Sequence, residues 1–230
     1  MRLDKYLAET TALSRGLAKK AINSGDVSCD GVVIKDPAFK VPQGARVCFQ
    51  GEVLALVGVR YLMLHKPVDT ICSTQDEYYP SVISLLDIPR PDKLHIAGRL
   101  DADTTGLVLI TDDGHWSHKV TSPKRDCAKR YRVKLADPLT ADLIDTFAQG
   151  LQLNGEDGLT KPARLEILGD TEALLSITEG KYHQVKRMFA AVGNKVIGLH
   201  REAVGAIELD PELLPGEWRY LTEAEIASVK

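Results

Sequence analysis

The sequence predicts an α+β protein of two domains, a small one over residues 1–58 and a larger one over residues 59–230. Helical and strand patterns mix along the second domain without the regular strand–helix–strand order of a parallel sheet. This indicates a mixed, largely antiparallel sheet with flanking helices. The 230 residues, 44% hydrophobic and 27% charged, are enough to form an apolar core in each domain.

The first domain is predicted to hold two helices followed by a hairpin. Apolar residues within 3–7 recur at helical spacing, and Ser14 is a suitable N-cap for a second helix that Gly25 ends. Asp30-Gly31 then separates two short apolar runs, which predicts a tight hairpin because glycine readily adopts the positive φ that the turn needs. The second helix also carries basic residues, so the domain presents a basic ridge.

The second domain follows a predicted hinge at residues 50–60. Short apolar or alternating runs predict its strands, and longer runs with helical periodicity predict its helices. The expected strands are 61–64, 107–111, 129–135 and 174–178, and the expected helices are 141–148 and 184–192.

Composition excludes several classes of protein. The first ten residues are charged from the second position and no apolar run reaches the length of a membrane span, so we expect a cytoplasmic protein without membrane association. The four cysteines lie far apart without a CxxC pair, and His115 and His118 lack further ligands at suitable spacing. We therefore expect neither a redox motif nor a metal site.

The net charge of −3 conceals two basic segments. Residues 115–135 contain seven lysines and arginines against Asp126 alone, and residues 180–201 contain five and no acid. Such segments on an acidic body would attract a polyanion to one face. Two solvated element faces would produce the same pattern, so charge alone leaves nucleic-acid binding open.

One short stretch, GRLDADTTGL from Gly98 to Leu107, places two carboxylates in a turn before an apolar strand. Asp101 and Asp103 would share a face of extended backbone. Taken alone, an Asx turn or a strand cap explains them better than catalysis does. The sequence has no phosphate-binding loop, dinucleotide fingerprint or GxSxG elbow, which argues against the common cofactor-dependent and triad-type enzymes.

The opening residues RLDKYLA, the Ser-Arg pair that begins the second helix and the glycine-spaced run from Gly25 to Lys35 resemble the alpha-L RNA-binding module. This module occurs in a small-subunit ribosomal protein, in tyrosyl-tRNA synthetases and in some RNA-modifying enzymes. The resemblance implies that five basic residues contact RNA phosphates: Arg2, Lys5, Arg15, Lys19 and Lys20.

HIAGRLDADTTGLVLITDDG, KRYRV and EGKYHQVKRMFAAVGNKVIGLHR, in this order, resemble three motifs of the pseudouridine synthases, in the branch that includes the small-subunit ribosomal RNA enzymes. The resemblance implies an isomerase that converts a specific uridine of 16S ribosomal RNA to pseudouridine, of the type that acts at position 516, and that needs no cofactor. The glycosidic bond breaks, uracil turns, and a carbon–carbon bond forms to the same sugar.

The same resemblance assigns roles to single residues. Asp101 would be the catalytic carboxylate, either a nucleophile toward the anomeric carbon or a base toward the ribose, whereas Asp103 falls at a variable position. Lys186 would keep Asp101 ionised in a closed pocket, and Tyr131 would stack on the uracil. Arg99 would occupy the space that the extruded base leaves.

Three further basic residues are expected to bind RNA near the pocket: Lys129, Arg130 and Arg187. The early motif of the family, NKPxG, is here His65-Lys66-Pro67-Val68-Asp69, and the loss of its Asn and Gly leaves this turn without an assigned role.

The partner implied is 16S ribosomal RNA or a partly assembled small ribosomal subunit. We expect a monomer, because the sequence contains no amphipathic stripe that would pack against a second copy. Two alternatives stay open: a related synthase acting on 23S ribosomal RNA, and a non-catalytic RNA-binding factor in ribosome assembly.

Overall fold

A computed structural model describes residues 1–229 and divides the chain into two compact units. The first unit comprises Met1–Gly58 with the short segment Ile88–Asp92, and the second comprises Val59–Asp87 with Lys93–Lys230. Arg90 ties the short segment to the first unit by donating hydrogen bonds to the carbonyls of Ala8 and Glu9. Among the described residues, no helix is long and apolar enough to cross a membrane.

The first unit consists of two helices and a four-stranded antiparallel sheet in the order β2-β1-β3-β4. The Ser14 side chain accepts a hydrogen bond from the amide of Leu17, and Gly25 ends the second helix at φ 88°. Asp30 and Gly31, at φ 49° and 83°, form the predicted hairpin turn. The elements are α1 (Leu3–Thr10), α2 (Arg15–Ser24), β1 (Val27–Cys29), β2 (Val32–Val33), β3 (Val47–Phe49) and β4 (Glu52–Leu54).

The predicted hinge at residues 50–60 is too long at its N-terminal end. Gln50 and Gly51 have φ values of 51° and 87° and join β3 to β4. β4 pairs with β3 across Val47–Leu54 and Phe49–Glu52. The first unit therefore extends beyond Leu54, because a second hairpin occupies the first half of the expected hinge.

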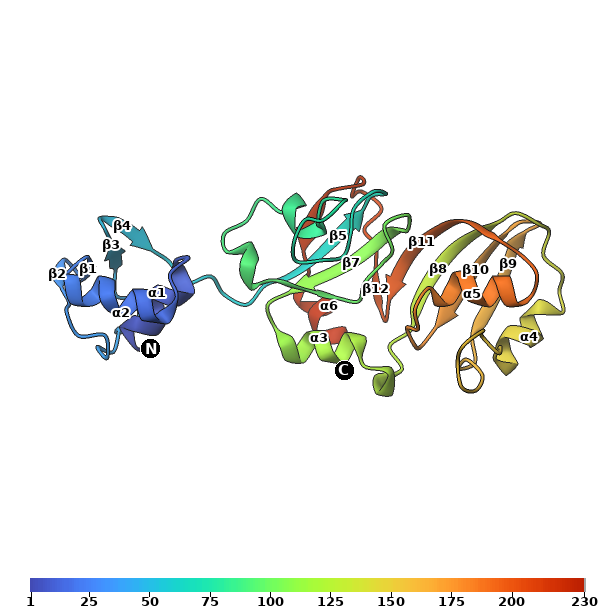
Figure 1. Cartoon of the computed structure of the whole chain (residues 1–230), viewed down its shortest axis with the longest axis horizontal. Helices are drawn as coiled ribbons and strands as arrows, with labels where there is room; N and C mark the ends of the chain where they lie inside the picture. The colour runs from blue at the N-terminus through green and yellow to red at the C-terminus, as the bar shows by residue number, and fades with distance from the viewer. Residues whose placement is uncertain (230) are drawn as a thin grey trace. The chain divides into compact units, whose positions relative to one another are not determined.

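The second unit is built on one mixed sheet in the order β13-β5-β7-β11-β8-β10-β9, with β6 added to β7 and β12 to β11. Figure 1 labels most of these strands, from β5 to β12. β7 and β11 are parallel, and the other described strand pairs of this sheet are antiparallel. This confirms the predicted fold class. The strands are β5 (Tyr61–Lys66), β6 (His95–Ala97), β7 (Thr105–Thr111), β8 (Lys129–Leu135), β9 (Arg164–Gly169), β10 (Glu172–Ile177), β11 (Val196–Val204), β12 (Ile207–Glu208) and β13 (Trp218–Tyr220).

Helices cover this sheet and complete its core. Trp116 packs with Leu107 and Leu109 in one buried cluster, and the backbone carbonyl of Ile226 accepts the Trp116 indole hydrogen bond at 3.0 Å. Apolar burial here anchors the strand that follows the GRLDADTTGL turn. The helices are α3 (Gly114–Thr121), α4 (Leu143–Gln149), α5 (Gln184–Ala191) and α6 (Glu223–Ser228), with short 3₁₀ turns at Val82–Leu85, Pro91–Lys93 and Pro123–Arg125.

The sequence pattern misses β11, although this strand lies near the middle of the sheet between β7 and β8. A central strand is usually recognised by apolar alternation. In β11 a fully packed interior position holds Arg201, which is 2% exposed, and its neighbour His200 is also polar. Of these two polar residues, Arg201 lines the candidate site described below.

Candidate active site

A cavity of about 720 Å³ opens in the second unit beside the turn that precedes β7. Its walls come from this turn, from β8 and β11, and from the segment that leads into α5. Residues far apart in the sequence thus meet at one place. The charged and aromatic residues in its lining include Arg99, Asp101, Lys129, Tyr131, Lys181, Tyr182, His183, Lys186 and Arg201.

Lys186 lies between the two carboxylates of the turn. Its Nζ is 3.0 Å from Oδ2 of Asp101 and 2.7 Å from Oδ1 of Asp103. Asp101 is 33% exposed and Asp103 is 71% exposed, so Asp101 is the carboxylate that faces the cavity. Burial lowers the pKa of Lys186, but hydrogen bonds and charges from Asp103 and Asp101 outweigh it and leave the pKa above the usual lysine value. Lys186 is therefore a permanent cation at neutral pH.

His183 lies near the other carboxylate oxygen of Asp101. Its Nε2 is 3.4 Å from Oδ1 of Asp101. The residue has a positive φ of 46° just before α5, a conformation that non-glycine residues seldom adopt. This backbone directs His183 at the carboxylate from the same segment that supplies Lys186, a contact that sequence reasoning missed.

Arg201 fixes the turn against Tyr131. Gly106, Arg201 and Tyr131 are register partners across β7, β11 and β8. The Arg201 guanidinium donates to the carbonyls of Leu107 at 2.8 Å and Gly98 at 2.9 Å, and lies 3.5 Å from the Tyr131 hydroxyl. A Cβ at Gly106 would lie 2.3 Å from the Arg201 carbonyl oxygen, so only glycine permits this pairing. Arg201 falls in the basic segment at residues 180–201 that was expected to attract a polyanion, but it is buried in the structure.

Lys66 fixes the turn around Asp101 through hydrogen bonds from its ammonium group. Its buried Nζ donates to the carbonyls of Pro67, Ala102 and Thr104 at 2.9, 3.2 and 2.8 Å. Burial lowers the pKa of this lysine. The Lys66-Pro67 pair, which is retained from the family motif NKPxG, could have predicted this role. The loss of the Asn and Gly of that motif left the turn without an assigned role.

The structure brings four predicted site residues together and separates others. Asp101, Lys186, Tyr131 and Arg99 all line the cavity, with Tyr131 buried and Arg99 exposed. Thr104 closes the turn, because its amide donates to the Asp101 carbonyl at 3.1 Å. A carboxylate, a cation and an aromatic ring therefore line the same cavity, where one ligand can contact all three.

The structure gives internal partners to the three basic residues expected to bind RNA near the pocket, Lys129, Arg130 and Arg187. Lys129 is buried, with Nζ bound to the carbonyls of Val120 and Cys127, because it occupies an inward position of β8. The next residue, Arg130, does not line the cavity and is ion-paired with glutamates on neighbouring strands.

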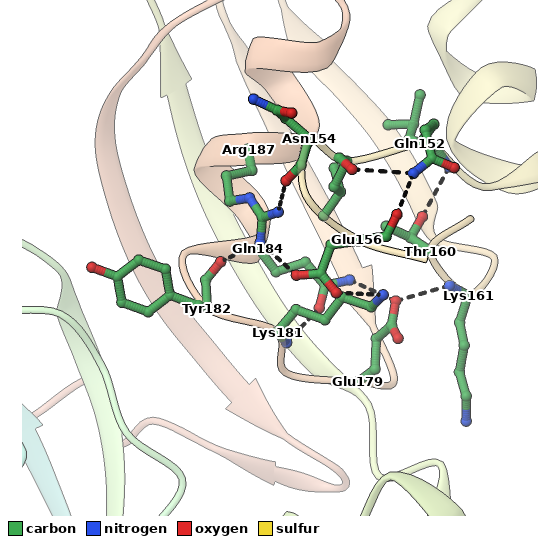
Figure 2. A network of polar contacts seen from close by, with 12 residues as sticks. Gln152, Asn154, Glu156, Thr160, Lys161, Glu179, Lys181, Tyr182, Gln184 and Arg187 are labelled. Atoms are coloured by element: carbon green, nitrogen blue, oxygen red, sulfur yellow. Dashed lines mark hydrogen bonds and ion pairs between the residues drawn. The ribbon is translucent and has the colours of Figure 1, made fainter. Parts of the chain in front are cut away.

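Arg187 is also held within the protein. It binds Glu156 at 2.9 Å and the backbone carbonyls of Tyr182 and Asn154 at 3.1 and 2.6 Å (Figure 2). A guanidinium with three partners inside the protein fixes the positions of those partners. We therefore do not count it as a free phosphate contact.

The five predicted RNA-contacting residues of the first unit are exposed: Arg2, Lys5, Arg15, Lys19 and Lys20. Asp4, fully buried, pairs with Arg2 at 3.0 Å and with Arg15 at 3.4 Å. The hydrogen bond from Arg2 holds the pKa of Asp4 below its usual range. Asp4 thus orients Arg2 and Arg15, a role that the sequence alone did not reveal.

Asp103→Asn is expected to lower the pH above which the rate of catalysis at Asp101 declines. The hydrogen bond from Asp103 is the largest contribution that raises the pKa of Lys186, so its loss lets Lys186 lose its proton at lower pH. A raised lysine pKa keeps the cation at all lower pH values, and the charge disappears as pH rises through that pKa. Rates measured between about pH 7 and pH 11 should be similar at pH 7 and should fall at lower pH in the variant than in the wild-type protein. Asp157→Asn is the control, and coinciding alkaline limbs would contradict the assignment.

Comparison with known proteins agrees with both units. The family model described as RNA pseudouridylate synthase matches residues 60–191, and that of the S4 domain matches residues 1–47. A crystal structure of a pseudouridylate synthase superposes with a TM-score of 0.73 at 48% identity, covering all of both chains. The chain belongs to the RNA pseudouridylate synthase family and carries an N-terminal S4 domain. The resemblance found in the sequence is thereby confirmed.

Relatives that match the full length of this chain carry a more specific name than the family. The ribosomal small subunit pseudouridine synthase A of Vibrio cholerae is 56% identical over 229 residues, covering 100% of this chain and 99% of the relative. The protein of the same name from Escherichia coli strain K12 is 53% identical over 230 residues, covering 100% of both. The similarity therefore includes the S4 domain and the catalytic unit together.

Proposed function

We propose that this protein is an isomerase that converts a uridine of 16S ribosomal RNA to pseudouridine. The observation that carries the proposal is the position of Asp101, whose carboxylate faces the cavity 3.0 Å from the Lys186 ammonium, with Tyr131 in the same lining. The names of the full-length relatives favour the small ribosomal subunit as the source of the RNA. Position 516 is the target that we expect.

Asp101 supplies the reacting carboxylate. It acts either as a nucleophile toward the anomeric carbon or as a base toward the ribose, and both routes require its ionised form. Lys186 stabilises that form by charge and hydrogen bonding, which opposes the protonation that a closed pocket favours. The C–N glycosidic bond breaks, a new C–C bond forms to carbon 5 of the uracil, and the proton lost from that carbon is balanced by protonation of the freed nitrogen. The product is an isomer of the substrate, so the reaction needs no redox partner.

Tyr131 provides a flat partner for the uracil while it turns. Its ring is buried and lines the cavity, and Arg201 restrains its hydroxyl end. A target inside structured RNA must first leave its stack, which costs a few kcal/mol. Arg99 would enter the vacated space, a role supported by its exposure and its place in the cavity lining.

The S4 domain supplies affinity rather than chemistry. Its exposed arginines and lysines would bind phosphates and make the affinity depend strongly on salt. The chain is proposed to act in the cytoplasm, as a monomer, on 16S ribosomal RNA or on a partly assembled small subunit.

Mass-spectrometric mapping of pseudouridine in ribosomal RNA tests this function. Cells lacking the protein should lose one pseudouridine, in 16S RNA at position 516, and the wild-type gene should restore it. The same assay with purified protein, on naked 16S RNA and on assembling subunits, identifies the substrate. Loss of a 23S site would assign the protein to the other subunit, and an unchanged map would indicate a non-catalytic assembly factor.

A further inference from the structure

A large aromatic side chain stands exposed at the mouth of the cavity. Tyr182 is 76% exposed and lines the cavity beside His183. The two rings are stacked, with centroids 3.8 Å apart and planes inclined by 22°. Nε2 of His183 lies 3.4 Å from Oδ1 of Asp101. The two stacked rings therefore extend from the solvent-exposed surface to the candidate catalytic carboxylate.

The backbone at Tyr182 is held in place by a polar network. The Arg187 guanidinium donates to the Tyr182 carbonyl at 3.1 Å and is itself fixed by Glu156 at 2.9 Å and the Asn154 carbonyl at 2.6 Å. Figure 2 shows the Tyr182 ring pointing away from these partners. The network therefore fixes the main chain and leaves the ring available.

The same network is anchored in the core. Gln184, 4% exposed, donates to Glu179 at 2.8 Å and accepts from the Lys181 amide at 2.8 Å. Lys181 in turn pairs with Glu156 at 3.1 Å. Contacts within the protein thus hold the segment that presents Tyr182, which reduces the conformational entropy lost when a ligand stacks on the ring.

Such a ring suits an RNA base. One side of Tyr182 contacts His183, and most of the remaining surface meets solvent. Extrusion of a uridine leaves its neighbour without a stacking partner, and aromatic side chains commonly replace that partner in RNA complexes. The position at the cavity mouth selects the neighbour of the target rather than the target itself.

We propose that Tyr182 is a stacking platform for the nucleotide next to the target uridine. The proposal rests on the proposed function, because it takes RNA as the occupant of the cavity. It adds a substrate-binding residue outside the group of Asp101, Lys186 and Tyr131, and it explains why a bulky ring stays exposed there.

Kinetics of three variants test the platform. Tyr182→Ala should raise KM by about tenfold while kcat changes by less than about threefold, and Tyr182→Phe should behave as wild type because phenylalanine keeps the ring. Tyr78→Ala is the matched control, since Tyr78 is 91% exposed and does not line the cavity. Equal effects of Tyr182→Ala and Tyr78→Ala, or a loss confined to kcat, would overturn the proposal.

A binding measurement separates this idea from the proposed function. Fragments of 16S RNA carrying 2-aminopurine on the 5′ or the 3′ side of the target are titrated with the Asp101→Asn protein, with and without Tyr182→Ala. We expect quenching at one of the two probe positions, lost when Tyr182 is replaced. Unchanged fluorescence at both positions overturns the platform. Absence of pseudouridine with the wild-type protein overturns the proposed function, and the quenching still reports on Tyr182.

Discussion

Asp101→Asn is expected to lower the rate of pseudouridine formation by about 10⁴-fold or more. Asparagine keeps the size of the side chain but can act neither as a nucleophilic carboxylate nor as a base. It also keeps an oxygen near Lys186, so the turn should stay folded. RNA affinity should change little, because phosphate contacts supply most of it.

The measurement pairs single-turnover assays with filter binding to the same 16S RNA. Asp157→Asn, an exposed carboxylate in the catalytic unit that does not line the cavity, is the control and should retain full activity. Residual activity of Asp101→Asn within about tenfold of wild type would refute the assignment. Lost binding together with lost activity would indicate a structural role instead.

Gly106→Ala is expected to reduce the free energy of unfolding by about 3 kcal/mol or more. The new Cβ would lie 2.3 Å from the Arg201 carbonyl oxygen and 2.6 Å from the Arg201 nitrogen. These are backbone atoms of the paired strand, so β7 and β11 would have to separate. The φ of 108° adds strain, because side chains disfavour this conformation.

Urea unfolding followed by tryptophan fluorescence measures this loss. Gly114→Ala is the matched control, since a Cβ there meets nothing within 4 Å. Activity should fall with Gly106→Ala even below the unfolding transition, because separation of the strands moves Arg201 away from the Gly98 carbonyl. A stability equal to that of Gly114→Ala would show that the strands adjust without loss.

Local patterns were sufficient wherever one segment carries its own physical signal. Ser14, Gly25 and Asp30-Gly31 end or turn their elements through their own backbone and side chains, so they could be predicted. β8 was predicted with its bounds, because apolar and basic residues alternate along it. Asp101 and Lys186 were predicted through ordered motifs, although neither would have been distinguished from a cap or a surface residue on its own.

Long-range pairings could not be predicted from the same patterns. Lys129 and Arg201 appear as basic surface residues in the sequence, yet each is buried and bonded to backbone carbonyls, Lys129 to nearby Val120 and Arg201 to Leu107 in a distant strand. Lys66 binds the carbonyls of Ala102 and Thr104, which lie more than thirty residues away. Charge in a sequence does not reveal whether water or protein will satisfy it.

The amino-acid sequence by itself determined the two-domain α+β organisation, the carboxylate turn and its order with the later motifs, because spacing and turn chemistry are local. Only the tertiary structure decided that Gly106 makes room for Arg201, that Asp101 and Asp103 share Lys186, and that Tyr182 remains exposed. These arrangements depend on which strands become neighbours, and strand order is set by packing of the whole sheet rather than by any single segment.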